Sequence, residues 1–178
     1  APKTDSSGYF GIKQPAIAIT GTNGKTTVTL LVEHILNTSG IKAKALGNVG
    51  NPLSVYVLNP DPGVVIVAEL SSYQLETMST PVFDAAAILN ITPDHLDRYA
   101  SMEEYAKAKC RLQHLLKPGS PFFVSQQVAG GFAHLLKPGF IVYTKSESIE
   151  EILSQEYREL GEHDIENAMA AWVLCKPF

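Results

Sequence analysis

The chain has 178 residues, of which 45% are hydrophobic and 18% are charged, and its formal net charge is −4. These values are typical of a globular domain that can bury its own core. The negative balance and the lack of a basic stretch in the sequence exclude a general nucleic-acid binder. No apolar run approaches the ~20 residues that span a bilayer, so we also expect no membrane segment.

The N-terminal residues 1–14 read as a polar linker, and the apolar run Ala16–Ile19 then predicts a short buried strand. A glycine turn follows the strand. From Lys25 to about residue 39, apolar residues recur every three or four positions, which predicts a helix with one apolar face.

The turn between this strand and helix, Gly21–Thr27, reads G-x-x-G-K-T-T. Glycines let backbone N–H groups close around a phosphate, and the start of a helix adds a favourable partial charge. Lys25 can neutralise phosphate oxygens, and the hydroxyl of Thr26 can ligate magnesium. The pattern is shorter than the phosphate loop G-x-x-x-x-G-K-[ST]. An ordinary glycine-rich turn with a surface lysine therefore stays open as the alternative.

A second glycine turn, Gly47–Gly50, follows residues 41–46, which predict a short strand at the edge of a sheet. Asn51 and Pro52 then resemble the N-cap and first residue of a helix. The β-branched run Val64–Ala68 predicts a central parallel strand that is covered on both faces.

The rest of the chain continues the alternation of helices and strands. We expect a helix at about 72–78, a strand within 84–90, a helix from Ser101 to about Leu116 with Ser101 and Glu104 as a capping box, strands at 121–124 and 140–143, and helices at 147–155 and 164–174. This order predicts an α/β domain of the phosphate-loop, mononucleotide-binding type, with a mostly parallel sheet flanked by helices. Ligands of such sheets bind beyond the carboxyl ends of the strands. The glycine turn, Glu69 and the loop Asp94–Asp97 each follow a strand, so we expect them to share one crevice.

Two ionisable positions at this sheet edge could bind metal or substrate. Glu69 ends an apolar strand and supplies, with Thr26, the hard oxygens that magnesium prefers. The alternative is an acid that merely reaches solvent where its strand ends. His95 lies among Asp94, Asp97 and Arg98, and imidazole is an unusual magnesium ligand. The residues alone therefore favour a surface position or a substrate-facing role for His95.

Lys109 falls inside the apolar arc of its expected helix, whereas Lys107 points the other way. A lysine that faces the core is rare unless it is paired or functional. The alternative is a side chain whose stem lies along the core and whose amine reaches solvent. Cys110 and Cys175 share no metal-type spacing, so we expect two reduced thiols in a cytoplasmic protein.

Four ordered segments resemble the central domain of the Mur ligases over about residues 16–175. They are GTNGKTT, ELSSYQLE at Glu69–Glu76, NITPDHLDRY at Asn90–Tyr99 and YAKAK ending at Lys109. The resemblance implies an ATP- and Mg²⁺-dependent, amide-forming ligase of bacterial peptidoglycan synthesis, and hence a part in cell-wall biogenesis, cell shape and cell division. Within the family, SSYQLE with DHLDRY is most similar to the members that add D-glutamate to UDP-N-acetylmuramoyl-L-alanine.

The ends of the sequence predict a piece of a longer enzyme. The chain starts without methionine and stops directly after an apolar helical pattern. We expect residues 15–178 to be the central ATP-binding domain alone, monomeric and inactive by itself, because the family places its other substrate sites in N- and C-terminal domains.

The resemblance also implies the roles of individual residues. Lys25, His95 and Lys109 would be catalytic, and Lys109 would be carbamylated. The ATP site would comprise Gly21, Thr22, Asn23, Gly24, Lys25, Thr26, Thr27 and Asn167. The metal ligands would be Thr26 and Glu69 for a first Mg²⁺, and His95 with the Lys109 carbamate for a second. The uridine nucleotide would be faced by Asn48 and Ser71.

One position departs from the family pattern. Asp164 stands where the family's H-N-x-x-N segment near the adenine usually has asparagine, whereas Asn167 fits that segment. A carboxylate cannot donate the hydrogen bonds of an amide, which puts a base contact at Asp164 in doubt.

Two alternatives to this reading stay open. One is the central domain of another ligase of the superfamily, such as the diaminopimelate- or lysine-adding enzyme, folylpolyglutamate synthetase or cyanophycin synthetase. The other is a phosphate-loop binding module without ligase chemistry. Such a module needs no second metal ligand, so a position of His95 and Lys109 far from the loop would favour it.

Overall fold

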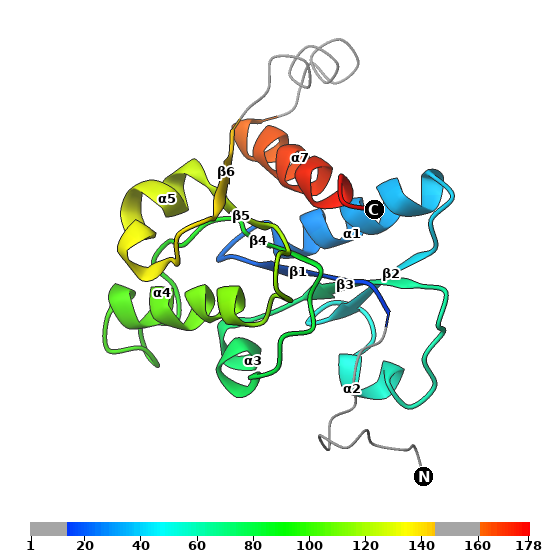
Figure 1. Ribbon diagram of the computed structural model, residues 1–178. Coiled ribbons are helices and arrows are strands. Elements are labelled where there is room, and N and C mark those ends of the chain that lie inside the picture. Colours follow the sequence, from blue (N-terminus) through cyan, green and yellow to red (C-terminus); the bar gives the residue numbers. More distant parts are fainter. Residues whose placement is uncertain (1–13, 145–160) are drawn as a thin grey trace.

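The computed structural model describes residues 14–144 and 161–178. Their strands form one six-stranded sheet in the order β2-β3-β1-β4-β5-β6, and every neighbouring pair is parallel (Figure 1). The strands are β1 (Ala16–Thr20), β2 (Ala43–Gly47), β3 (Val65–Glu69), β4 (Ala85–Ile88), β5 (Phe122–Ser125) and β6 (Ile141–Tyr143). The predicted α/β class with a mostly parallel sheet is confirmed.

Helices cover both faces of this sheet. They are α1 (Lys25–Thr38), α2 (Leu53–Tyr56), α3 (Ser72–Thr77), α4 (Met102–Cys110), α5 (Gln126–Phe132) and α7 (Glu162–Cys175), with 3₁₀ turns at Arg111–His114 and Ala133–Leu135. In Figure 1, α1 and α7 lie together above the sheet, α3 and α4 lie below it, and α5 lies at the left beside β5 and β6. Residues 1–13 of the expected linker and the helix expected at 147–155 lie outside the described residues.

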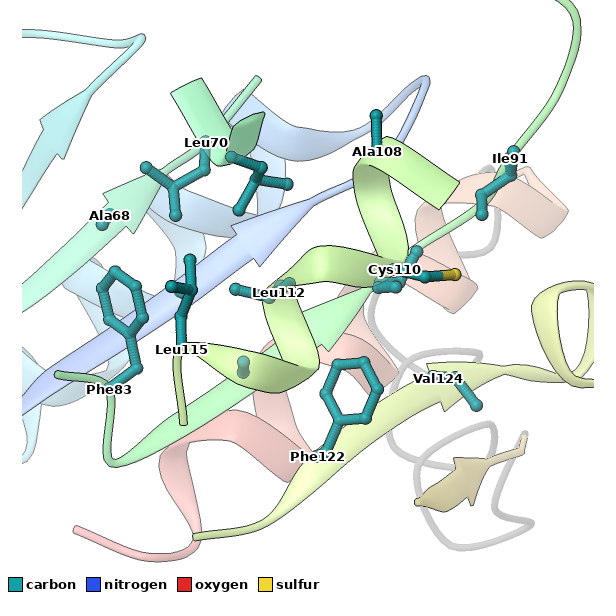
Figure 2. Packing of buried hydrophobic residues seen from close by; sticks show 14 of the residues in the cluster. Ala68, Leu70, Phe83, Ile91, Ala108, Cys110, Leu112, Leu115, Phe122 and Val124 are labelled. Atoms are coloured by element: carbon teal, nitrogen blue, oxygen red, sulfur yellow. The ribbon is translucent and has the colours of Figure 1, made fainter. Parts of the chain in front are cut away.

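Side chains of the central strands alternate between two hydrophobic clusters. On β1, Ile17 and Ile19 join the cluster under α1 and α7, whereas Ala16 and Ala18 join the cluster under α3, α4 and α5. Figure 2 shows part of the second cluster, in which side chains from the end of α4 and its 3₁₀ turn pack against β4 and β5. Burial of each large apolar side chain contributes ~1.5–3 kcal/mol, so the two clusters fix the positions of the strand ends.

Strand β2 lies at an edge of the sheet, as its sequence predicts, and α1 covers its free edge with polar side chains. The Ala43 N–H donates to Asn37 Oδ1 at 3.1 Å, and Asn37 Nδ2 donates to the Ala43 carbonyl at 3.1 Å. The Ala45 N–H donates to Glu33 Oε1 at 2.8 Å. These bonds satisfy edge groups that could otherwise pair with another chain.

The helix after the second glycine turn begins one residue later than expected. Pro52 is the N-cap of α2, with φ −56° and ψ 140°, so it is not the first helical residue. The Asn51 carbonyl accepts a hydrogen bond from the Gly47 N–H at 3.0 Å. This bond ties Asn51 to the turn after β2 and delays the helix.

The expected helix from Ser101 to Leu116 is also shorter, because it tightens into a 3₁₀ turn after Cys110. Its capping box is half confirmed. Ser101 Oγ accepts from the Glu104 N–H at 3.2 Å, but Glu104 Oε2 accepts from the N–H of Ala100, at 3.2 Å, and not from that of Ser101.

Within residues 14–144 and 161–178, no helix combines the length and the apolar character needed to cross a membrane.

Candidate active site

The glycine turn Gly21–Thr27 joins the carboxyl end of β1 to α1, at the edge of the sheet where the sequence predicts a ligand. Gly24 is the N-cap of α1 and has φ +81°, a left-handed conformation that glycine adopts without strain. The first hydrogen bond of the helix joins the Val28 N–H to the Gly24 carbonyl. The preceding N–H groups, on Lys25, Thr26 and Thr27, therefore lack intrahelical acceptors and provide donors for an anion.

The first half of the turn is held by Asn90, which follows β4. The Thr22 N–H donates to the Asn90 carbonyl and to Asn90 Oδ1, and the Asn23 N–H donates to the same Oδ1 at 2.8 Å. Asn90 Nδ2 donates back to the Asn23 carbonyl at 3.1 Å. The N–H groups of Thr22 and Asn23 are thus engaged within the protein, which leaves the second half of the turn to meet a phosphate.

Glu69, at the end of β3, is 1% exposed and contacts two of the predicted site residues. Thr26 Oγ1 donates to Glu69 Oε2 at 2.7 Å, and Asn48 Nδ2 donates to Glu69 Oε1 at 2.7 Å. The second glycine turn is also fixed to this strand by its backbone, because the Asn48 N–H donates to the Glu69 carbonyl. The carboxylate, the Thr26 hydroxyl and the phosphate-loop helix therefore meet, as predicted. The alternative of an acid that reaches solvent is wrong.

Lys109 is 2% exposed, and its amine also lies in the interior. Its Nζ donates to the Gly21 carbonyl at 2.8 Å and lies 4.7 Å from the centre of the Tyr105 ring. Burial, and then the charge of Lys25, lowers the pKa of the Lys109 amine to about 7. The alternative in which the amine reaches solvent is therefore wrong. Lys107, in contrast, is exposed and pairs with Glu103 at 3.6 Å.

His95 lies on an exposed turn next to these groups. Its backbone has φ +52°, the left-handed region that few residues other than glycine adopt. Its ring centre lies 5.2 Å from that of Tyr73 and 6.1 Å from that of Tyr105, and its Nε2 lies 3.5 Å from Asp94 Oδ2. The Tyr105 hydroxyl is 3.2 Å from Thr22 Oγ1. Tyr105 therefore connects the histidine turn to the phosphate loop.

The described residues contain no group of three or more His, Cys, Asp and Glu side chains that could hold a metal ion by themselves. Glu69 and Thr26 form one cluster of oxygen ligands, and His95 lies on a separate turn. The arrangement suits a cation that takes part of its coordination from phosphate oxygens.

A cavity of about 720 Å³ opens beside the phosphate loop and extends to α7. Its lining includes Gly24, Asn90, Tyr143, Glu166 and Asn167. Asn167 lies so close to Gly24 that a Cβ atom at Gly24 would clash with its Oδ1 atom. The last helix therefore forms one wall of the cavity next to the phosphate loop.

Comparison with known proteins agrees with this geometry. The family model described as Mur ligase middle domain matches residues 19–148. The chain belongs to the Mur ligase middle domain family. A UDP-N-acetylmuramoylalanine--D-glutamate ligase of Protochlamydia amoebophila is 46% identical over 174 residues, which are 89% of this chain and 39% of that relative. The chain thus spans about two-fifths of the length of this curated relative.

Solved structures share the fold of this Mur ligase middle domain. A UDP-N-acetylmuramoyl-L-alanyl-D-glutamate--2,6-diaminopimelate ligase superposes with a TM-score of 0.68 at 21% identity, covering 92% of this chain and 43% of that one. A MurF ligase of Thermotoga maritima, solved in complex with ADP, gives a TM-score of 0.56 at 16% identity, covering 73% and 32%.

The Mur ligase middle domain brings most of the predicted site residues to one sheet edge, but Ser71, and also Asp164 outside that set, have local bonds that the sequence did not indicate. Ser71 caps α3, with its Oγ accepting from the Gln74 N–H at 3.3 Å and donating to Gln74 Oε1 at 3.0 Å. Asp164 Oδ2 accepts from the Gly161 N–H at 3.1 Å and so caps α7. Asp164 is not part of the cavity lining, whereas Asn167 is.

Asn90 and Tyr105 are two residues of the site that no sequence motif marks individually. Both lie inside the segments that carry the family resemblance, NITPDHLDRY and YAKAK. Their positions in those segments are the only sequence signal for them, because their contacts depend on which strands and helices become neighbours.

Proposed function

We propose that this chain is the ATP-binding middle domain of a ligase that joins D-glutamate to UDP-N-acetylmuramoyl-L-alanine. The observation that carries the proposal is the 46% identity to a relative of that name across 89% of the chain. The geometry supports it, because a phosphate loop, a buried carboxylate and a buried lysine meet at one edge of the sheet. The enzyme would act in the cytoplasm as a monomer, in the synthesis of the bacterial cell wall.

The proposed reaction begins with the carboxylate of UDP-N-acetylmuramoyl-L-alanine. A carboxylate oxygen attacks the γ-phosphorus of ATP, the bond from that phosphorus to the bridging oxygen breaks, and ADP leaves with the electron pair. The D-glutamate amine then attacks the acyl carbon of the acyl phosphate, and inorganic phosphate leaves as the amine loses a proton. Lys25 and the N–H groups at the start of α1 would stabilise the negative charge of the transferring phosphoryl group.

The residues present fit a magnesium ion. Glu69 offers a buried carboxylate oxygen, and Thr26 offers a hydroxyl oxygen that lies 2.7 Å from it. Mg²⁺ prefers hard oxygen ligands of this kind. We propose that these two side chains hold a first Mg²⁺ with the ATP phosphates and that His95 contributes to a second. Bound magnesium would supply charge neutralisation on the phosphate oxygens. Asn48 would keep Glu69 in place through its 2.7 Å hydrogen bond to the carboxylate. Asn48 and Ser71 would also face the uridine-nucleotide substrate.

Lys109 is the proposed site of a carbamate. An amine with a pKa of about 7 is partly neutral at physiological pH, and only the neutral amine reacts with CO₂. The nitrogen lone pair would attack the carbon of CO₂, an N–C bond would form, and a proton would leave to solvent. The product is an anion with two oxygens, and it would offset the positive charge of the nearby Lys25 and of magnesium.

The cavity next to α7 is the proposed site of the adenosine part of ATP, with Asn167 on its wall. Asp164 would contribute only through the helix that it caps. A phosphate-loop module without ligase chemistry is disfavoured, because Lys109 donates directly to the loop. The Helicobacter pylori folylpolyglutamate synthetase structure, at 14% identity, shares the fold alone and gives no reason to prefer that chemistry.

The test is ligation by the full-length enzyme that contains this chain. Phosphate release should require ATP, UDP-N-acetylmuramoyl-L-alanine and D-glutamate together. The isolated chain should fold but release no phosphate, because positioning of two further substrates is a large part of the catalysis. Equal turnover with diaminopimelate or lysine in place of D-glutamate would overturn the proposed specificity. Turnover by the isolated chain would overturn the proposal that the rest of the enzyme must position the other two substrates.

A further inference from the structure

The phosphate loop of this domain takes its shape from a residue outside the loop. Strand order places β4 directly beside β1, so the residues after β4 lie against the loop that follows β1 (Figure 1). Asn90 is the residue at this contact. Its amide accepts from the N–H groups of Thr22 and Asn23 and donates to the carbonyl of Asn23, at distances between 2.8 and 3.1 Å.

This contact compensates for the short length of the loop. Only Thr22 and Asn23 separate its two glycines, compared with four residues in the longer phosphate-loop pattern. A side-chain amide has both an acceptor and a donor, so it can hold a loop N–H and a loop carbonyl at once. With Thr22 and Asn23 fixed in this way, Gly24 reaches the left-handed conformation from which α1 starts.

We propose that Asn90 is a positioning residue for phosphate binding, and this inference rests on the proposed nucleotide-binding function. By holding Thr22 and Asn23, it directs the N–H groups of Lys25, Thr26 and Thr27 toward one point, where the phosphates bind. Asn90 also lines the cavity proposed for adenosine, but both ends of its side-chain amide are bonded to the loop, so we expect its contribution to belong to the phosphate part of the nucleotide.

Two substitutions separate the loss of the positioning bonds from the addition of a charge. Asn90→Ala removes the three side-chain bonds. Asn90→Asp has the same shape and keeps both contacts to the loop N–H groups, but it loses the donor and adds a negative charge beside the phosphates. Aspartate keeps the two bonds that position the loop, so any further loss of affinity for a phosphorylated ligand measures the charge that it adds. Asn90→Ala removes the positioning bonds without adding a charge, so it is the variant that tests the positioning role.

The chain offers a matched control in Asn37. Its amide also accepts from a backbone N–H and donates to a backbone carbonyl, both on Ala43, but it lies at the far end of α1 from the phosphate loop. Asn37→Ala should lower the thermal midpoint of unfolding and leave nucleotide affinity unchanged.

The experiment measures dissociation constants of Mg·ADP and of adenosine by calorimetry on the full-length enzyme and its variants. We expect Asn90→Ala to raise the dissociation constant of Mg·ADP by about 20-fold, which corresponds to the loss of two or three ordinary hydrogen bonds, and Asn90→Asp to raise it further. The dissociation constant of adenosine should change less than threefold in both variants. The inference is overturned if both Asn90 variants bind Mg·ADP within threefold of the unmodified enzyme, or if adenosine weakens in parallel. If the unmodified enzyme shows no saturable binding of Mg·ADP, the proposed function itself fails.

Discussion

The two ends of the parallel sheet hold their lysines in different ways. At the amino ends of the strands, Lys117 Nζ lies 2.8 Å from both carboxylate oxygens of Asp84. Asp84 Oδ2 also accepts from the Ala16 N–H at 2.9 Å, so this carboxylate joins the start of β1 to the segment before β5. The charge of Lys117 is neutralised by a partner that the protein itself supplies.

At the carboxyl ends, Lys25 and Lys109 donate hydrogen bonds to main-chain oxygens of the phosphate loop. Lys25 Nζ donates to the Thr22 carbonyl at 2.9 Å, and Lys109 Nζ donates to the Gly21 carbonyl at 2.8 Å. A carbonyl satisfies a hydrogen bond of an ammonium but leaves its charge in place. One end of the sheet thus uses a lysine for structure, whereas the other keeps the positive charge of Lys25 for a ligand and holds the Lys109 amine in the interior.

The largest effect should follow from removing the charge at the loop. Lys25→Ala in the full-length ligase should lower kcat/KM for ATP at least ~1,000-fold, because an uncompensated ammonium beside the phosphates is lost. Lys25 is only partly buried, so the thermal midpoint of unfolding should change little. Unchanged kinetics in a folded variant would remove the distinction between the two ends of the sheet.

Removal of the buried lysine should also lower activity, by ~100-fold or more, because the proposed carbamate is a charged group in the site. Lys109→Ala should regain part of its activity when a short-chain carboxylic acid such as acetate or propionate fills the vacated space. Steady-state turnover with increasing acid concentration measures this. The matched control is Lys107→Ala on the exposed face of α4, which should keep its activity. Full activity of Lys109→Ala without added acid would exclude the carbamate.

The same lysine should make the stability of the isolated chain depend on pH. The pKa of Lys109 is about 7 in the folded state and near its ordinary value of 10.5 when unfolded, so the unfolded chain binds more protons between these values. Its destabilising effect is therefore complete below pH 7 and is relieved as the pH rises toward 10.5.

Lys109→Met should consequently stabilise the chain more at pH 6 than at pH 9, by about 2–3 kcal/mol in the free energy of unfolding. Urea unfolding of both proteins at the two pH values, without magnesium, measures the difference. If Lys109→Met changed the free energy of unfolding equally at both pH values, burial would not lower the pKa of the Lys109 amine.

The smallest effect should follow from the ion pair at the opposite end. Lys117→Met removes a salt bridge whose side chains are 36% and 32% exposed and should cost about 0.5–1 kcal/mol of stability, because solvent screens such pairs. Nucleotide affinity should not change. Urea unfolding and calorimetric titration with Mg·ADP check the two statements, and a weaker affinity would show that the amino ends of the strands also influence the site.

Much of the fold follows from local pattern. Apolar runs predicted β1, β3 and β4, and periodic apolar residues predicted α1 and α7, because these elements are buried on the faces that the pattern marks. Helix α5 was not predicted, since Gly130 and Gly131 disfavour a helix locally. Ser125 Oγ nevertheless accepts from the Val128 N–H, and buried Val128 packs in the core. Tertiary packing thus outweighed local propensity.

The candidate site was predictable only in part. Glycine, lysine and threonine at fixed spacing indicated the phosphate loop, and the apolar arc of α4 indicated a buried Lys109. The bonds of Asn90 could not be predicted, because they depend on β4 lying beside β1 and sequence patterns do not give strand order. The link from Asn48 to Glu69 depends in the same way on β2 lying beside β3.

Helix α7 sets a lower limit on the piece of chain that can hold a nucleotide. The family match ends at residue 148, yet α7 lies beyond it and supplies Met169, Ala170 and Leu174 to the cluster under α1. It also supplies Asn167 beside Gly24. A truncation at the end of the matched segment would expose the apolar face of α1 and open the cavity to solvent. Any fragment used to screen for inhibitors at this site should therefore extend through Cys175.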